Sequence, residues 1–168
     1  TDLLTSLNED GSIKDGNTIE TWTPIGNNQN SFTGTFDGQG HTISGLYFKD
    51  SNTIYVGLFG YNSGTIKNVG VVDSYFKGLD YVGGVCGYND GGKITGCNNT
   101  GTVSGNTGVG GVCGYNNGGK ITGCYNTGTV KGNSYVGGVC GQNSSGTITN
   151  CYYLIGTATG GIDSNNVT

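Results

Sequence analysis

Thiol chemistry is the first possibility that this sequence raises, because its six cysteines recur at a fixed spacing. They form two sets in which successive members are 27 residues apart: Cys86, Cys113 and Cys140, and Cys97, Cys124 and Cys151. No Cys-x-x-Cys pair is present, and each set continues upstream as Phe, Val or Leu. We therefore expect two columns of buried free thiols, in which cysteine packs as a small apolar residue, and no metal site. Disulfides between neighbouring copies are the alternative, because a strand spacing of about 4.8 Å allows them.

The sequence contains few residues that could carry out acid–base or nucleophilic catalysis. His41 is the only histidine, and no Ser–His–acid or Cys–His set can be assembled around it. Polysaccharide lyases and hydrolases need paired carboxylates, or calcium-binding Asp clusters with a basic residue. Asp37, Asp73 and Asp90 do not recur in one column, and arginine is absent. We therefore expect no enzymatic activity and no cofactor.

Tyrosine and asparagine recur with the same period as the cysteines. Tyr61, Tyr88 and Tyr115 are expected to stack at one corner, where aromatic side chains can bind sugars or partner proteins. The alternative is that they only stiffen the structure. The remaining tyrosines are expected elsewhere: Tyr81, Tyr125, Tyr135 and Tyr152. A turn column follows the tyrosines, in which each amide holds its own turn and hydrogen-bonds to its neighbours: Asn62, Asn89, Asn116 and Asn143.

These columns require stacked copies of one unit. The segment Val82–Asn89 recurs as Val109–Asn116 and Val136–Asn143, and the period is 27 residues. Upstream, we align Phe36 with Phe59 and Ile43 with Ile66 as degraded copies. Within one repeat we expect strands at Val82–Tyr88, Lys93–Cys97 and Gly101–Ser104. Because one such unit cannot bury its own apolar face, neighbouring units must form the core together.

The predicted fold is all-β, a right-handed parallel β-helix of about five coils with roughly 27 residues each. The 36 glycines and the single proline fit many tight turns. A propeller blade would need about 40 residues or more, and a sandwich does not demand a constant period. We expect residues 1–31 to cap the first coil, residues 32–157 to form the repeats, and residues 158–168 to be a tail or the start of a further coil.

Charge and hydropathy exclude two classes of partner. The net charge is −4, and the seven basic residues are scattered lysines without a basic patch, so we expect no nucleic-acid binding. No apolar run is long enough to span a membrane. The chain begins at Thr1 without a basic leader, and we expect it to be trimmed from a longer secreted precursor.

Two segments identify a family resemblance. Val82–Asn89 and Ile121–Val130 resemble the GLUG motif of very large bacterial surface proteins, which also occurs near the N-terminus of bacterial immunoglobulin A metalloproteases. Trp22–Gly26 and Phe32–Leu46 are similar to what precedes those repeats. The resemblance covers about residues 20–155 and implies a secreted, surface-anchored protein. It implies no reaction, because the zinc signature His-Glu-x-x-His of the metalloproteases is absent.

These observations favour a non-enzymatic cell-surface module that acts as a rigid spacer or adhesion domain in a larger secreted bacterial protein. Its expected partners are the flanking domains of the same polypeptide and, if it is adhesive, a host glycan or matrix protein. Two alternatives stay open. One is a carbohydrate-binding module that uses the Tyr and Asn columns, and the other is a β-helix polysaccharide lyase or hydrolase.

Overall fold

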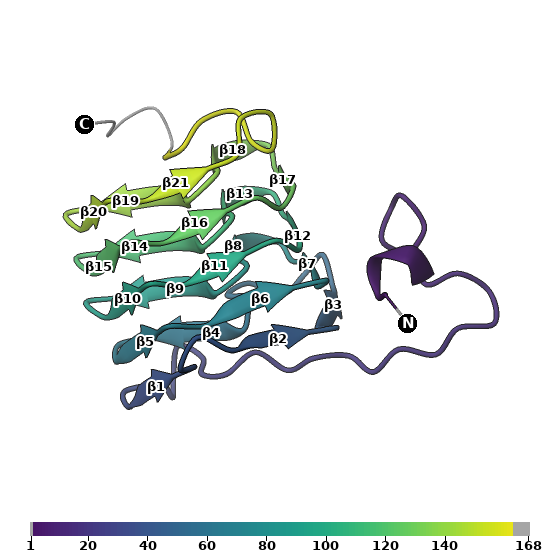
Figure 1. Cartoon of the computed structure of the whole chain (residues 1–168), viewed down its shortest axis with the longest axis horizontal. Coiled ribbons are helices and arrows are strands. Elements are labelled where there is room, and N and C mark those ends of the chain that lie inside the picture. Colours follow the sequence, from purple (N-terminus) through teal and green to yellow (C-terminus); the bar gives the residue numbers. More distant parts are fainter. Residues whose placement is uncertain (1, 163–168) are drawn as a thin grey trace.

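A computed structural model describes residues 2–162 of the chain. From residue 21 onward, the chain winds into a parallel β-solenoid (Figure 1). Two sheets have five strands each. The first sheet contains β1 (Thr35–Asp37), β5 (Thr65–Lys67), β10 (Lys93–Thr95), β15 (Lys120–Thr122) and β20 (Thr147–Thr149). The second contains β2 (Thr42–Ser44), β6 (Gly70–Val72), β11 (Asn98–Asn99), β16 (Tyr125–Asn126) and β21 (Tyr152–Tyr153).

Three shorter sheets complete each coil. The third contains β3 (Tyr47–Lys49), β7 (Tyr75–Lys77), β12 (Thr102–Ser104) and β17 (Val130–Lys131). The fourth contains β8 (Asp80–Gly83), β13 (Thr107–Gly110) and β18 (Ser134–Gly137). The fifth contains β4 (Phe59–Asn62), β9 (Cys86–Asp90), β14 (Cys113–Asn117) and β19 (Cys140–Ser144). All the strand pairs in these sheets are parallel, as a β-helix requires.

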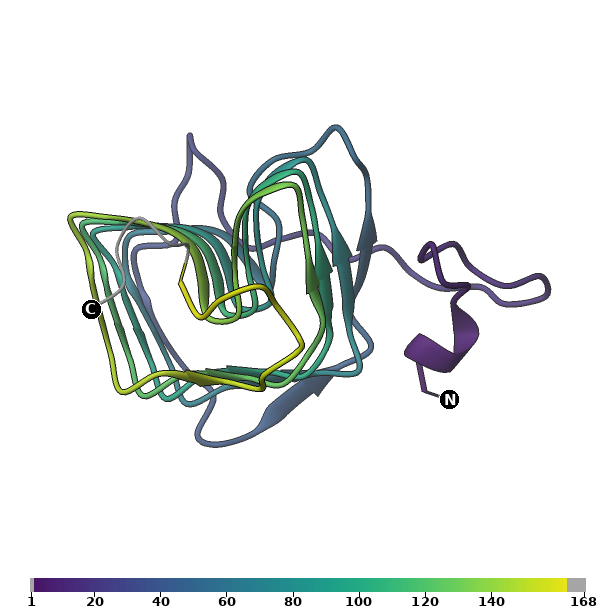
Figure 2. The ribbon, with the colours of Figure 1, turned by 90° about the horizontal axis from the view of Figure 1, so that it is seen from above.

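The predicted β-helix is confirmed, with about four full turns, because only two of the five sheets reach five strands. Seen from the C-terminal end, the chain turns counterclockwise as it rises toward the viewer, which is the right-handed sense (Figure 2). The expectation of three strands per coil is wrong, since the coils at residues 78–104 and 105–131 carry five strands each. The predicted strand Val82–Tyr88 is divided between β8 and β9, and Lys93–Cys97 ends early at Thr95.

An inward turn explains the division of that strand. Each coil is indented once in cross-section (Figure 2). Gly84 lies at the turn, where a Cβ would collide with the side chain of Asn99 on the opposite side of the core. Gly111 meets Asn126 in the same way one coil later. Because Gly84 and Gly111 have no side chain, the backbone at these positions can approach the sheet on the opposite side of the core and bend there.

The core is a set of vertical columns between the sheets. One column of β-branched and aromatic residues follows the first sheet: Phe36, Ile66, Ile94, Ile121 and Ile148. Another follows the fifth sheet: Phe59, Cys86, Cys113 and Cys140. Our alignment of the first coil was wrong, because Phe36 pairs with Ile66 and not with Phe59, and Ile43 pairs with Val71. Ile25 occupies the position beside Phe59, so the first coil begins earlier than its sequence suggests.

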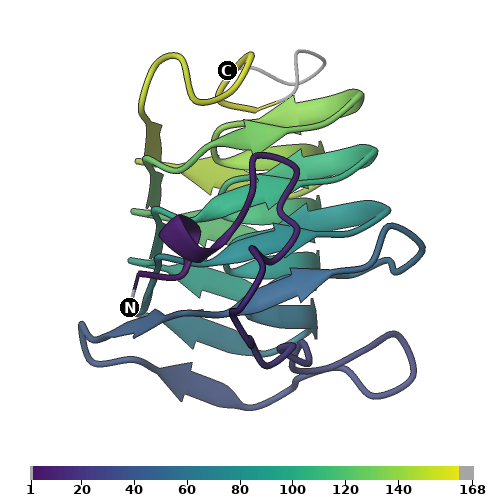
Figure 3. The same cartoon turned by 90° about the vertical axis from the view of Figure 1, so that its right-hand side faces the viewer.

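The N-terminal and C-terminal segments of the described chain lie at opposite ends of this stack. Thr21, Ile25 and Phe32 make parallel bridges to Tyr47, Phe59 and Asn62, so residues 21–32 line the first coil. Before them, a short 3-10 helix, η1 (Leu4–Ser6), lies against the side of the solenoid (Figure 3). At the other end, Ile162 bridges to Cys140, while residues 163–168 of the predicted tail lie outside the described part. The domain bounds at residues 31 and 157 stay predictions. No helix within residues 2–162 is long and apolar enough to cross a membrane.

Candidate functional site

A cluster that we call the tyrosine face lies beside the fifth sheet and consists of Tyr55, Tyr61, Tyr81, Tyr88 and Tyr115. Tyr61, Tyr88 and Tyr115 are in register on β4, β9 and β14. The ring centroids of Tyr61 and Tyr88 are 4.7 Å apart with planes at 12°. Tyr88 and Tyr115 are 4.8 Å apart at 52°. These three residues therefore form one column, stacked between Tyr61 and Tyr88 and tilted between Tyr88 and Tyr115, which ends at Gln142 on β19.

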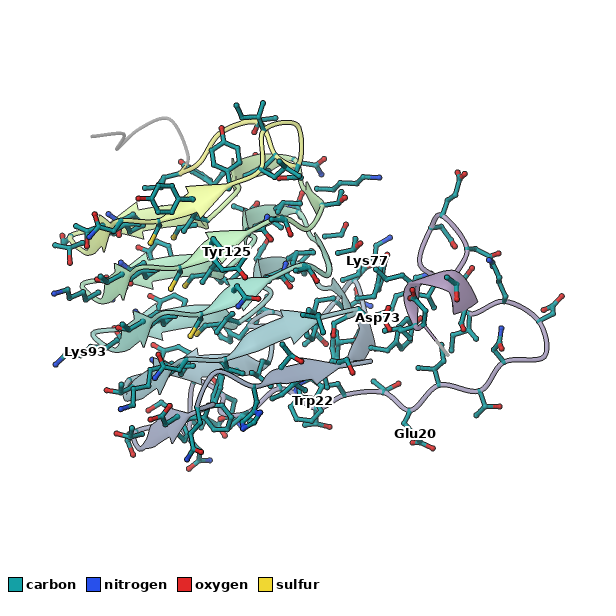
Figure 4. The ribbon with its side chains drawn as sticks, in the orientation of Figure 1. Glu20, Trp22, Asp73, Lys77, Lys93 and Tyr125 are labelled. Carbon is teal, nitrogen blue, oxygen red and sulfur yellow. The ribbon has the colours of Figure 1, made fainter. Side chains whose placement is uncertain are left out.

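A second column belongs to the tyrosine face and was missed in the sequence. Tyr55 and Tyr81 stack at 5.7 Å and 11°, and Tyr81 meets the edge of Tyr88 at 5.5 Å and 89°. The expectation that Tyr81 lies elsewhere is therefore wrong. The sequence did contain a signal, because Tyr55, Tyr81 and Tyr135 each directly precede a valine of the core column. Tyr125 and Tyr152 do lie elsewhere, as an exposed pair on β16 and β21 (Tyr125 is labelled in Figure 4).

The backbone of this second column is strained. Tyr55, Tyr81 and Tyr135 have φ angles of 63°, 56° and 54°, in the left-handed region. The equivalent residue of the intervening coil is Gly108, with φ of 68°. Glycine adopts this conformation freely, whereas a side chain there costs on the order of 1–3 kcal/mol. Tyrosine is thus present at three coils where the backbone favours glycine.

The hydroxyl groups of Tyr61 and Tyr88 are neutral at physiological pH. Tyr61 donates a hydrogen bond to Asp90 over 3.1 Å, and Asn117 donates to the other carboxylate oxygen over 2.9 Å. Burial and the Asp90 carboxylate raise the pKa of Tyr61 to about 12. Burial and the neighbouring tyrosines raise the pKa of Tyr88 to about 12. Because the rings cover each other's faces, the surface presents ring edges and hydroxyl groups that can exchange hydrogen bonds with a neutral partner.

An apolar groove adjoins the tyrosine face at the first coils. It is lined by Trp22, Pro24, Phe48, Ile54 and Tyr55, with threonines, Lys49 and Asp50 at its rim. The indole nitrogen of Trp22 donates to the carbonyl of Gly57 over 3.1 Å, which fixes the ring in the wall (Figure 4). Tyr55 therefore belongs to both the groove and the tyrosine face.

The asparagine column is buried inside the turn that follows the tyrosines. Asn62 donates to Asn89 over 2.7 Å, Asn89 to Asn116 over 2.8 Å, and Asn116 to Asn143 over 2.8 Å. Each amide also donates to a glycine carbonyl of its own turn, as Asn89 does to Gly92 over 3.0 Å. A second ladder, from Asn99 to Asn126, was not foreseen. Its amides close the next turn of the coil, so both ladders position the backbone and present no free amide to a ligand.

The cysteines form two columns of free thiols, one on each side of the core. Cys86, Cys113 and Cys140 are fully buried, and burial raises the pKa of Cys113 and Cys140 well above the usual range. Cys97 and Cys124 are also fully buried. Cys151 departs from the expectation of full burial and is only partly buried against the core, because β20 and β21 are the last strands of their sheets in the described chain.

A comparison with known families matches "The GLUG motif" to residues 78–104, 105–131 and 132–152. Each of the first two matches corresponds to one coil, from β8 to β12 and from β13 to β17. The chain is 36% identical over 107 residues to Halomucin of Haloquadratum walsbyi, which covers 62% of this chain and 1% of Halomucin. It is 36% identical over 56 residues to a putative Gly-rich membrane protein of Evansella cellulosilytica, which covers 32% of this chain and 6% of that protein.

These comparisons do not identify an enzymatic reaction. Neither relative's name nor the family description refers to an enzymatic activity. Halomucin is an archaeal protein, so the expectation of a bacterial source stays a prediction. No solved structure gave a significant match to the chain.

Proposed function

Because this chain carries three GLUG motifs wound into a parallel β-solenoid, we propose that it is a structural repeat module of an extracellular or cell-surface protein and serves there as a rigid spacer. The single observation that carries this proposal is the unbroken in-register stacking of the coils. The coils at residues 78–104 and 105–131 pair with each other along all five sheets, and the same residue types recur in the columns. Such a stack resists bending and lengthens by a fixed step for each added coil.

The relatives support a place outside the cell. One is named a mucin and the other a membrane protein, and this chain spans only a few per cent of either. A module that forms a small part of a long chain suits a spacing role, since its length can be adjusted by adding coils. The anchoring and any adhesive or catalytic domains would then belong to other parts of the polypeptide.

The spacer proposal is tested by a length series. Inserting one, two or three further copies of residues 105–131 after residue 131 adds whole coils in register. The height of the stack along the solenoid axis, obtained from shape fits to small-angle X-ray scattering, should grow by about 4.8 Å per added coil, the spacing of paired strands. Growth that is irregular, or a particle that becomes flexible as coils are added, would refute a rigid spacer.

A second candidate function is weak binding of a glycan or a matrix protein through the tyrosine face. It is favoured by one observation, the strained backbone of Tyr55 and Tyr81. Strained residues persist where their side chains are needed, and these two side chains build the surface around Tyr88. The edges and hydroxyl groups that they expose suit a neutral, hydroxyl-rich partner such as a polysaccharide.

This second function is tested by a screen of glycan arrays and immobilised matrix proteins with the intact chain. Saturable binding that is lost in Tyr88→Ala and Tyr115→Ala would make the module adhesive. Tyr125→Ala is the matched control, because Tyr125 is exposed on a different sheet. Absence of saturable binding, or equal loss in the control, would remove adhesion and leave the spacer.

A further inference from the structure

We propose that Asn98 is a modification site, which carries an N-linked glycan on the outward face of the second sheet. Asn98, Asn99 and Thr100 form the tripeptide Asn-x-Thr, the acceptor sequence for N-linked glycans in exported proteins. The proposal goes beyond the spacer role and rests on the proposed location outside the cell, because such glycans are attached during export.

The alternation of side chains along β11 places the acceptor sequence on the outside of the solenoid. The middle residue, Asn99, is fully buried and donates hydrogen bonds to Asn126 over 2.8 Å and to the carbonyl of Gly101 over 3.1 Å. Its two neighbours point the other way, because successive residues of a strand face opposite sides of the sheet. Thr100 is exposed and Asn98 is partly exposed. The two residues that define the acceptor sequence therefore both face outward.

The side-chain amide of Asn98 is not used by the fold. Within residues 2–162 it makes no hydrogen bond, in contrast to the amide of Asn99. It lies over Gly70, the in-register residue of the preceding coil, where a Cβ would come within 2.9 Å of Oδ1 and 3.2 Å of Nδ2. Because Gly70 has no side chain, it does not cover the amide. A glycan on Nδ2 therefore replaces no hydrogen bond of the folded chain and can extend into solvent.

An exposed tyrosine lies beside Asn98 in the next coil. Tyr125 pairs in register with Asn98 and is 44% exposed (Tyr125 is labelled in Figure 4). The first sugar of a glycan on Asn98 can pack against this ring, since an aromatic side chain offers an apolar surface with a polar tip. The glycan would then cover aromatic surface that otherwise favours association between molecules.

A second acceptor sequence within residues 2–162 has the opposite surroundings. Asn143, Ser144 and Ser145 form the tripeptide Asn-x-Ser, but Asn143 belongs to the asparagine column. Its side chain accepts a hydrogen bond from Asn116 over 2.8 Å and donates one to the carbonyl of Gly146 over 3.0 Å. A glycan there would be attached to an amide nitrogen that points into the turn, so a chain modified at Asn143 should not close this turn. The structure thus distinguishes two acceptor sequences that look alike in the sequence.

The transfer balances with an oligosaccharide on a lipid diphosphate as the donor. Nδ2 of Asn98 attacks the anomeric carbon of the first sugar, the bond from that carbon to the diphosphate oxygen breaks, and the lipid diphosphate leaves. One amide proton passes to a base of the transferase, and the other stays on the nitrogen. The step precedes folding of this coil, because in the folded chain the backbone amide of Asn98 donates to Val69 over 3.0 Å and the carbonyl of Cys97 accepts from Tyr125 over 3.0 Å.

The experiment is peptide mapping by mass spectrometry of the protein isolated from the cells that produce it. We expect the peptide that contains Asn98 to carry the added mass of a glycan, and the peptide that contains Asn143 to be unmodified. Exported protein with a bare Asn98 would overturn this proposal and leave the spacer role untouched. Protein found only inside the cell would overturn the proposed location as well, so the two failures are distinguishable.

Two variants, secreted with the parent chain from eukaryotic cells, remove one acceptor sequence each. Thr100→Ala should lose the glycan at Asn98. Ser145→Gly is the matched control, because it reproduces Gly118 at the equivalent place of the preceding coil, and it should keep that glycan. Glycosylated parent chain and Thr100→Ala should resist protease equally. A glycan on Asn143 in place of Asn98 in folded chains, or lower protease resistance of the chain glycosylated at Asn98, would contradict the proposal.

Discussion

At the scale of single residues, the tyrosine face combines favourable ring packing with an unfavourable backbone. Tyr81 contacts the rings of Tyr55, Tyr88 and Tyr115, and each aromatic pair contributes about 0.5–1.5 kcal/mol. Its φ of 56° opposes this by a similar amount. The sequence placed Tyr61, Tyr88 and Tyr115 in one column because period alone determines register. It did not place Tyr81 beside them, because that contact depends on the inward turn between β8 and β9.

The strained backbone predicts that glycine destabilises the protein less than alanine when it replaces Tyr81, which reverses the usual order of these two substitutions. Alanine removes the rings' contacts and keeps the strained φ, whereas glycine removes both, so Tyr81→Ala should be less stable than Tyr81→Gly by about 1 kcal/mol. Chemical denaturation monitored by circular dichroism measures the difference in the free energy of unfolding. Tyr125 is the control, since its φ is not positive and glycine should there be the less stable substitution. Tyr81→Ala being the more stable of the two would contradict a strained Tyr81.

The raised tyrosine pKa values predict a late step in an alkaline titration. Tyr61 and Tyr88 should ionise near pH 12, above the usual tyrosine value of about 10. Because their folded pKa lies above the unfolded one, their stabilising contribution is complete below about pH 10 and is lost as the pH rises through 12. Ultraviolet absorbance of the phenolate follows this. In the Asp90→Asn variant the Tyr61 step should move to lower pH, and an unchanged step would contradict the role of Asp90.

At the scale of the coil, the core columns could be predicted from the repeat period, whereas the turns that divide the strands could not. The columns of Ile94 and Cys86 follow from the 27-residue period, because in-register stacking places like residues above each other. The five short strands do not follow from it, since Gly84 and Gly96 bend the chain at places that look like strand interior. The first coil was misaligned because the equal spacing of Phe36–Ile43 and Phe59–Ile66 is a coincidence between different sheets.

The asparagine ladder predicts that a buried amide contributes more to the free energy of unfolding than an exposed one. Asn116 is fully buried, donates to Gly119 and Asn143, and accepts from Asn89. Asn116→Ala leaves buried polar groups without this partner and should lower the free energy of unfolding by about 2 kcal/mol. Asn133 also bonds to the coil below, through Asn106, but it is exposed, so Asn133→Ala should change the free energy of unfolding by less than about 0.5 kcal/mol. Equal effects of both substitutions in urea denaturation would contradict the claim that the buried ladder stabilises the fold more than the exposed bond does.

At the scale of the whole molecule, the solenoid is nearly one-dimensional: each coil contacts mainly the coil before and after it. The two ends of the stack differ from each other and from the repeating coils between them. The N-terminal coil is lined by residues 21–32 and flanked by a small cluster around Leu3, Leu7 and Tyr75. In the last coil of the described chain, Cys151 is only partly buried. These end features could not be predicted from the period, because the repeat pattern is lost there.

The central claim is that coils are interchangeable units whose number sets the length of the module, and a pair of excisions tests it most directly. Deleting residues 105–131 removes one 27-residue coil and brings Cys86 beside Cys140, in unchanged register. Deleting residues 105–131 together with Gly141 removes, in addition, one residue inside β19, which turns the following side chains of that strand to the wrong face. The extra deletion is placed in a strand because a turn absorbs one residue, as the 28-residue offset between Ile66 and Ile94 shows. Scattering and circular dichroism should show that the first variant is folded and shorter by about 4.8 Å, and that the second has lost its coils beyond the junction. If both variants fold equally well, or if the first unfolds, the coils are not interchangeable and the spacer account is contradicted.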